Sequence, residues 1–161
     1  MSHKGEMITI TGKDGFDFTA YEVSSEGARN GGLVLIQEIF GVTDHIKDLC
    51  DGYAERGFDV IAPSLYDRSE PGFQATYSEQ DIQTSIRLAG EFPLVDVLDD
   101  VQLCIDRLAD KGPVNITGYC YGGSVVLLAA CRCERRNAAS GYYGRHSVSF
   151  VEETPTRDVI L

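Results

Sequence analysis

A cysteine flanked by glycines is the residue in this sequence best suited to chemistry. Gly118, Cys120 and Gly122 form a G-x-C-x-G motif between the apolar run Val114–Thr117 and an apolar helical stretch. This is the pattern of a nucleophile elbow in which cysteine replaces serine. The glycines let strand and helix approach closely, and the sharp turn forces the central residue into strained dihedral angles. The motif predicts a nucleophilic thiol at Cys120, the alternative being a buried cysteine in a glycine turn.

The helix after Cys120 strengthens this prediction. Its amino end would point at the thiol, where partial positive charge favours the thiolate. The backbone N–H groups of Tyr121 and Ile39 are the candidates for holding an oxyanion beside it. A phosphate-binding turn shares the strand–glycine–helix design. Ser124 stands where that turn needs lysine, however, and G-x-G-x-x-G is absent, so phosphate binding ranks second.

Glu38 is the second candidate for a role in catalysis. It comes directly after the apolar run Leu33–Ile36 and its neighbour Gln37. In parallel α/β sheets, functional residues collect beyond the carboxyl ends of the strands, so Glu38 and Cys120 are predicted to share one edge. A carboxylate there could accept the proton of the thiol, or it could simply be solvated.

The segments that would position this site are alternately strand-like and helix-like in their apolar patterns. Alternation around Lys13-Asp14-Gly15 predicts an antiparallel hairpin, and apolar runs predict strands buried on both faces. The predicted strands are Met7–Thr11, Phe16–Val23, Leu33–Ile36, Val60–Ala62, Val114–Thr117 and Ala138–Tyr143. Such alternation indicates a single α/β domain over residues 1–161, with a mostly parallel sheet flanked by helices on both faces.

Apolar residues at helical spacing predict the connecting helices. These are Ile46–Ala54, Ser78–Gly90, Leu94–Leu108 and Val125–Cys131, of which the last is apolar all round and should be enclosed. The stripe of the third helix predicts core packing, with its aspartates facing solvent: Asp99, Asp100, Asp106 and Asp110. Cys50, Cys104 and Cys131 lie on apolar helix faces and are expected to be small core residues.

Composition excludes several classes of partner. The 161 residues carry 14 Lys and Arg against 25 Asp and Glu, a net charge of −11 that disfavours nucleic acid. No apolar run approaches the roughly 20 residues of a membrane span, and the amino terminus lacks a signal peptide's apolar core. Five cysteines without a C-x-x-C pair support neither zinc nor a disulfide framework. We expect a cytoplasmic protein with reduced thiols and neither metal nor cofactor.

Four motifs resemble the dienelactone hydrolase family of the α/β-hydrolase fold. They are Gln37-Glu38-Ile39-Phe40-Gly41, Ala62-Pro63-x-Leu65-Tyr66, Gly118-Tyr119-Cys120-Tyr121-Gly122-Gly123 and Gly141-Tyr142-Tyr143-Gly144. The resemblance implies a carboxymethylenebutenolidase-like hydrolase of ester or lactone bonds that needs no metal. It also implies that Cys120 is the nucleophile, that Glu38 contacts its thiol, and that Ile39 and Tyr121 supply the oxyanion N–H groups.

The resemblance ends before the family's catalytic Asp and His. Arg157–Leu161 looks like the opening of the next strand, so we expect an N-terminal portion that lacks the last strands and helices. The three histidines of the chain are poor substitutes for the family's catalytic histidine, because of their position or their order in the chain: His45, His146 and His3. Ile82 and Ile86 stand where the family grips an acidic lactone, which argues against dienelactone itself.

Two hypotheses follow. The first is a hydrolase of a small-molecule ester or lactone that acts through Cys120. The second is a catalytically inactive remnant that binds a carbonyl ligand or pairs with another chain. An unpaired apolar sheet edge would favour self-association in either case.

Overall fold

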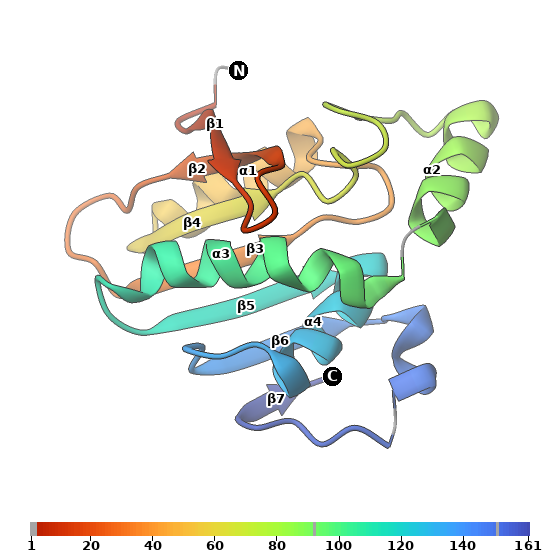
Figure 1. Cartoon of the computed structure of the whole chain (residues 1–161). Helices are drawn as coiled ribbons and strands as arrows, with labels where there is room; N and C mark the ends of the chain where they lie inside the picture. Colours follow the sequence, from red (N-terminus) through yellow and green to blue (C-terminus); the bar gives the residue numbers. More distant parts are fainter. Residues whose placement is uncertain (1–2, 92, 151) are drawn as a thin grey trace.

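One mostly parallel sheet organises the molecule (Figure 1). The computed structural model describes residues 3–91, 93–150 and 152–161. In this part of the chain the sheet has seven strands in the order β1-β2-β4-β3-β5-β6-β7. Its strands are β1 Glu6–Thr11, β2 Asp17–Val23, β3 Gly31–Ile36, β4 Phe58–Pro63, β5 Val114–Tyr119, β6 Ala138–Tyr142 and β7 Asp158–Ile160. The predicted hairpin is β1–β2, β2 is antiparallel to β4, and β4, β3, β5, β6 and β7 pair in parallel. The predicted fold class is confirmed.

The four predicted helices are present with shifted boundaries. They are α1 Asp44–Ala54, α2 Glu79–Glu91, α3 Leu98–Ala109 and α4 Tyr121–Arg132. Two 3-10 segments, η1 Leu94–Val97 and η2 Arg145–Phe150, complete the described set. The predicted third helix therefore opens as η1, and α4 begins at Tyr121 rather than Val125, directly after Cys120. No described helix is long and apolar enough to cross a membrane.

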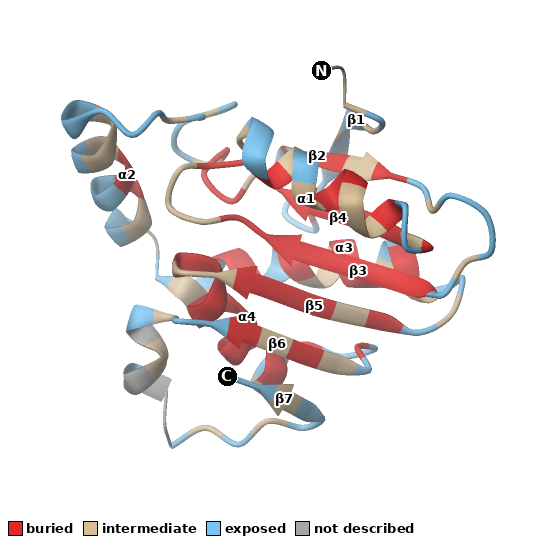
Figure 2. Ribbon diagram, turned by 180° about the vertical axis from the view of Figure 1, so that it is seen from behind, coloured by how far each residue is buried: buried red, intermediate tan, exposed pale blue. Residues whose placement is uncertain are grey.

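Helices pack on both faces of the sheet, in two separate apolar cores. Val34 and Ile36 of β3 point toward the core shared with α3 and α4. Leu33 and Leu35 point the other way, into the core under α1. Figures 1 and 2 show α3 and α4 on one side and α1 on the other, over β2 and β4. The alternation of β3 residues between the two cores explains why this strand is apolar throughout.

Among the described helices, none covers the α1 side of β5, β6 and β7 (Figure 2). Leu33 and Leu35 are paired with Asn115 and Thr117, so these polar residues share the α1 side of the sheet. The Thr117 hydroxyl donates to the Ser140 carbonyl at 3.1 Å, and the Ser140 hydroxyl donates to Thr117 Oγ1 at 3.0 Å. On this side Thr117 is buried and Asn115 is half-buried, so the prediction that β5 is buried on both faces holds except at Asn115 and at Tyr119, which ends the strand and is also half-buried.

Two further predictions about individual residues are wrong. Asp100 does not face solvent: its side chain is 2% exposed and accepts two hydrogen bonds from Arg68, at 3.0 and 2.8 Å. Cys131 is half-buried, whereas Cys50 and Cys104 are fully buried as expected. Helical spacing assigns a residue to a face of its own helix, but it cannot show which distant loop covers that face.

Candidate active site

The two predicted catalytic segments meet at the carboxyl ends of β3 and β5. These strands are neighbours, and Ile36 is paired with Gly118. The segments that follow them, starting at Gln37 and at Cys120, therefore leave the sheet side by side. A Cβ atom on Gly122 would lie 2.6 Å from the carbonyl oxygen of Gln37. The first turn of α4 thus rests on the backbone that leads to Glu38.

Cys120 has the strained backbone expected of an elbow. Its φ is 55° and its ψ is −119°, a region that L-residues rarely adopt. Hydrogen bonds hold it there: its N–H donates to the Tyr142 carbonyl at 3.0 Å, and its carbonyl accepts from Gly123 N at 3.0 Å. The residue is half-buried and lies at the N-cap position of α4.

Gly118 and Gly122 are required by the close approach of β5, β3 and α4. A Cβ on Gly118 would lie 2.6 Å from the carbonyl oxygen of Gly122, and one on Gly122 would lie 2.7 Å from the carbonyl oxygen of Ile36. Real Cβ atoms do not come this near to backbone oxygen atoms. The elbow can form only with glycine at both positions, as the G-x-C-x-G motif predicts.

The electrostatic setting of Cys120 differs from that of the other cysteines. Burial raises the pKa of Cys133 to about 11 and raises the pKa of Cys131, and it raises those of Cys50 and Cys104 much further. A raised pKa lowers the fraction of thiolate, so these four thiols should be poorer nucleophiles than a free cysteine. Cys120 differs from them in position, because it is the N-cap residue of the 12-residue helix α4.

Glu38 lies in a tight loop beside this turn. An antiparallel bridge pairs Glu38 with Gly41, and a second bridge pairs Gly41 with Gln74. The carboxylate is half-buried. Glu38 and Cys120 both act electrostatically on Tyr143, whose pKa is raised first by burial and then by these two charges. No hydrogen bond joins Glu38 and Cys120 among the described residues.

The two predicted oxyanion N–H groups, on Ile39 and Tyr121, come from the two neighbouring turns. Tyr121 is the first residue of α4, and Ile39 follows Glu38 in the loop after β3. Neither N–H donates to a backbone carbonyl elsewhere in the described chain. Both N–H groups therefore stay candidates for holding a ligand oxygen.

Two candidate substitutes for a catalytic histidine, His45 and His3, lie at α1 and make no hydrogen bond or ion pair with the elbow in the described chain. His45 is exposed in the first turn of α1, and His3 pairs with Asp44 and Asp48 at the same end of that helix. His146 lies in η2, and its side chain is outside the described part of the structure. In that part, no group of three or more His, Cys, Asp or Glu residues is arranged to hold a metal ion.

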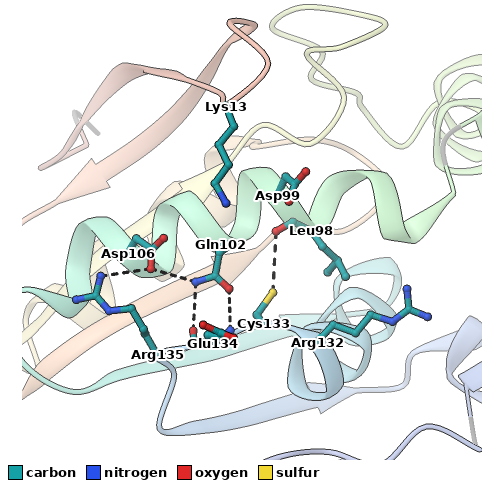
Figure 3. A pocket seen from close by; sticks show the side chains of 9 residues that line it. All are labelled: Lys13, Leu98, Asp99, Gln102, Asp106, Arg132, Cys133, Glu134 and Arg135. Carbon is teal, nitrogen blue, oxygen red and sulfur yellow. Dashed lines mark hydrogen bonds and ion pairs between the residues drawn. The ribbon is translucent and has the colours of Figure 1, made fainter.

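A groove of about 630 Å³ lies elsewhere, between α3 and the far end of α4 (Figure 3). Gln102 spans it: its amide donates to Asp106 at 3.1 Å, and its oxygen accepts from Glu134 N at 2.7 Å. Cys133 on its wall is separated from Cys120 by the whole of α4, about 18 Å. These bonds, and that of Arg135 to Asp106, tie the end of α4 to α3, and the groove is separate from the elbow.

Two tyrosines near Cys120 were given no role by the sequence analysis. Tyr66 is 2% exposed, and its ring lies 5.9 Å from those of Phe73 and Tyr121. Tyr143 follows β6, the strand next to β5. Functional residues tend to follow the carboxyl ends of parallel strands. Applied to β6 as well as to β3 and β5, this rule would have singled out Tyr143 from the sequence.

A Tyr66→Phe variant is expected to raise the free energy of unfolding by about 1 kcal/mol. The Tyr66 hydroxyl is buried and makes no hydrogen bond of normal geometry among the described residues. Burial raises its pKa, and only the nearby Gln37 side chain opposes that rise. Phenylalanine removes this unsatisfied group and keeps the ring contacts. Denaturant unfolding of both proteins measures the difference.

Tyr21→Phe is the matched control. The Tyr21 hydroxyl is also buried, but it donates to Asp51 at 2.6 Å and accepts from Gly5 N at 2.6 Å. Its removal should cost about 1–2 kcal/mol. Equal destabilisation by the two substitutions would mean that Tyr66 has a partner as well.

Comparison with known proteins agrees with this geometry. The sequence profile of the dienelactone hydrolase family matches residues 18–160. A carboxymethylenebutenolidase of Pseudomonas putida is 30% identical over 145 residues, covering 86% of this chain and 61% of the relative. A Synechocystis protein provisionally named as the same enzyme is 34% identical over 115 residues, covering 68% of this chain and 47% of its own.

A crystal structure of a Klebsiella pneumoniae protein, provisionally named a dienelactone hydrolase, superposes with a TM-score of 0.74 at 29% identity. The match covers 89% of this chain and 61% of that one. The chain spans about half the length of the curated relatives it matches. Because the family profile extends over nearly the whole sequence and the fold superposes on that crystal structure, the chain belongs to the dienelactone hydrolase family.

Proposed function

We propose that this protein hydrolyses carboxylic ester or lactone bonds with Cys120 as the nucleophile. The observation that carries the proposal is the conformation of Cys120, with φ 55° and ψ −119° at the junction of β5 and α4. A nucleophile elbow has this strand–turn–helix geometry. The name of the Pseudomonas putida relative, carboxymethylenebutenolidase, supports the same class of substrate.

The residues at the elbow suffice for the acylation half of the reaction. Glu38 takes the proton of the Cys120 thiol, and the thiolate attacks the carbonyl carbon of the ester. The carbonyl π electrons move to oxygen, which accepts hydrogen bonds from the N–H groups of Ile39 and Tyr121. Collapse of the tetrahedral intermediate expels the alkoxide, which takes the proton from Glu38. Cys120 is left as a thioester.

Turnover requires water to attack that thioester, with a base to activate the water. His45 and His3 lie at the amino end of α1 and do not contact Cys120. This observation favours a second candidate function, in which the chain binds a carbonyl compound or acylates once without turnover. The two candidates predict different time courses of product release.

Stoichiometric acylation is the experiment that tests the proposal. With 4-nitrophenyl acetate, we expect one acetyl group per chain on Cys120, located by peptide mass spectrometry. Sustained nitrophenolate release after this burst supports the hydrolase, whereas a burst alone supports the binding candidate.

Cys120→Ala should remove the burst completely. Cys131→Ala is the matched control, because Cys131 is the other half-buried cysteine, and it should leave the burst unchanged. A full burst from Cys120→Ala would refute the nucleophile assignment.

A further inference from the structure

A buried arginine without a carboxylate partner lies in the loop between α4 and β6. Arg136 is 3% exposed, and it forms no ion pair with an Asp or Glu side chain in the described part of the chain. Its neighbour Arg135 differs, because it is exposed and pairs with Asp106 at 3.4 Å (Figure 3) and with Asp110 at 2.6 Å. Arg136 is therefore the cation in this loop that is withdrawn from water and left without an anion.

Backbone oxygen atoms hold one part of the Arg136 guanidinium. Nε donates to the Ala129 carbonyl at 3.1 Å, and Nη2 donates to the Ala130 carbonyl and, at 2.8 Å, to the Thr156 hydroxyl oxygen. Nη1 is buried and has no hydrogen-bond partner among the described residues. The carbonyl end of a helix carries roughly half of an elementary negative charge. The end of α4 thus compensates only part of the positive charge of Arg136.

A pocket of about 340 Å³ adjoins this buried charge, and Arg136 and Arg157 both line it. Arg157 is exposed and makes no ion pair in the described chain. Burial lowers the pKa of Arg136, and the positive charge of Arg157 acts in the same direction. The remaining residues of the pocket wall are Cys133, Glu134, Arg135 and Thr156. Two positive charges without carboxylate partners therefore lie at one pocket, opposed there by the carboxylate of Glu134.

We propose that this pocket binds a phosphate group, either as inorganic phosphate or as part of a small phosphorylated molecule, through the charges of Arg136 and Arg157. Solvent ions screen a buried charge only weakly, so Arg136 attracts an anion in the pocket although its own side chain is enclosed. The exposed Arg157 guanidinium can donate directly, and its planar array of N–H groups matches phosphate oxygen atoms. Two cations attract a dianion more strongly than the single charge of a carboxylate. The proposed role of Cys120 does not enter this inference.

Isothermal titration calorimetry at constant ionic strength tests the proposal. At about pH 8 the phosphate group carries two charges. We expect saturable binding of inorganic phosphate to the wild-type protein, and acetate should bind about tenfold more weakly because it carries one charge. Glycerol phosphate distinguishes the two sources of the group. Tighter binding of glycerol phosphate indicates a phosphorylated small molecule, and tighter binding of inorganic phosphate indicates the free ion.

Two substitutions of exposed residues should change the affinity for phosphate in opposite directions. Arg157→Ala should weaken binding about tenfold, and Glu134→Gln should strengthen it about threefold, because they remove an attracting and a repelling charge. Arg87→Ala is the matched control, since it changes the net charge as Arg157→Ala does. Arg87 lies on α2, is 54% exposed and does not line the pocket, so the affinity should stay unchanged.

Arg136→Met removes the buried charge and keeps the length of the side chain. It should weaken phosphate binding by more than about tenfold. Because it also removes the hydrogen bonds to the end of α4, circular dichroism must show that the variant folds, and Arg157→Ala decides if it does not. Absence of saturable binding to the wild-type protein, unchanged affinity in Arg157→Ala, or an equal loss in Arg87→Ala would overturn the proposal. Equal affinity for acetate would reject phosphate as the ligand.

Discussion

A Gly122→Ala variant is expected to lose about 3 kcal/mol of the free energy of unfolding and to lose the reactivity of Cys120. The added Cβ would lie 2.6 and 2.7 Å from the carbonyl oxygens of Gln37 and Ile36. Both oxygens belong to the backbone at the end of β3, so no side-chain rotation relieves the clash. The first turn of α4 must move away from β3, and Cys120 and the candidate oxyanion donors would separate.

Gly90→Ala is the matched control for this prediction. Gly90 lies in α2, and nothing would come within 4 Å of its added Cβ. Alanine has the higher helix propensity, so this substitution should be neutral or stabilise by up to about 1 kcal/mol. Thermal or denaturant unfolding measures stability, and the rate of iodoacetamide labelling measures the reactivity of Cys120. A Gly122→Ala protein as stable and reactive as Gly90→Ala would mean that the elbow is looser than the structure shows.

An Arg68→Leu variant is expected to lose about 3–5 kcal/mol of stability, because it leaves a buried carboxylate unpaired. The Arg68 guanidinium donates to both oxygens of Asp100, whose side chain is 2% exposed. It also donates to Asp14 at 2.7 Å and lies 4.8 Å from the centre of the Phe16 ring. One cation thus connects α3 to the β1–β2 turn and to the segment after β4.

Arg132→Leu tests whether burial is the reason. Arg132 also makes a bidentate pair, with Glu153, but these side chains are 45% and 27% exposed. Loss of this pair should cost less than about 1 kcal/mol. The double variant Arg68→Leu with Asp100→Leu should recover part of the lost stability, since no charge is then left buried. Equal costs for the two arginine variants, measured by denaturant unfolding, would contradict this explanation.

The sequence alone was sufficient to place the strands and the four helices, though not their exact bounds or the two 3-10 segments, and to identify the glycine turn at Cys120. Periodicity is a local property, so the strands and helices could be located from nearby residues. The turn at Cys120 also depends on nearby residues only, because Gly118, Cys120 and Gly122 lie within five residues. The two glycines indicated that the strand and the helix backbones pack closely there. Because the apolar run Val114–Thr117 leads directly into this motif, the sequence also placed β5 immediately before Cys120.

The tertiary structure decided which distant residues share a surface. The helical spacing of α3 predicts that Asp100 faces solvent. Arg68, 32 residues earlier in the chain, instead donates a hydrogen bond to its carboxylate, which is buried. Asn115 and Thr117 lie in a strand of apolar character, but the described helices cover only one of its faces. The Tyr142 carbonyl accepts the Cys120 N–H because the sheet places β5 and β6 side by side. Such meetings depend on strand order and loop paths, which no local pattern in the chain specifies.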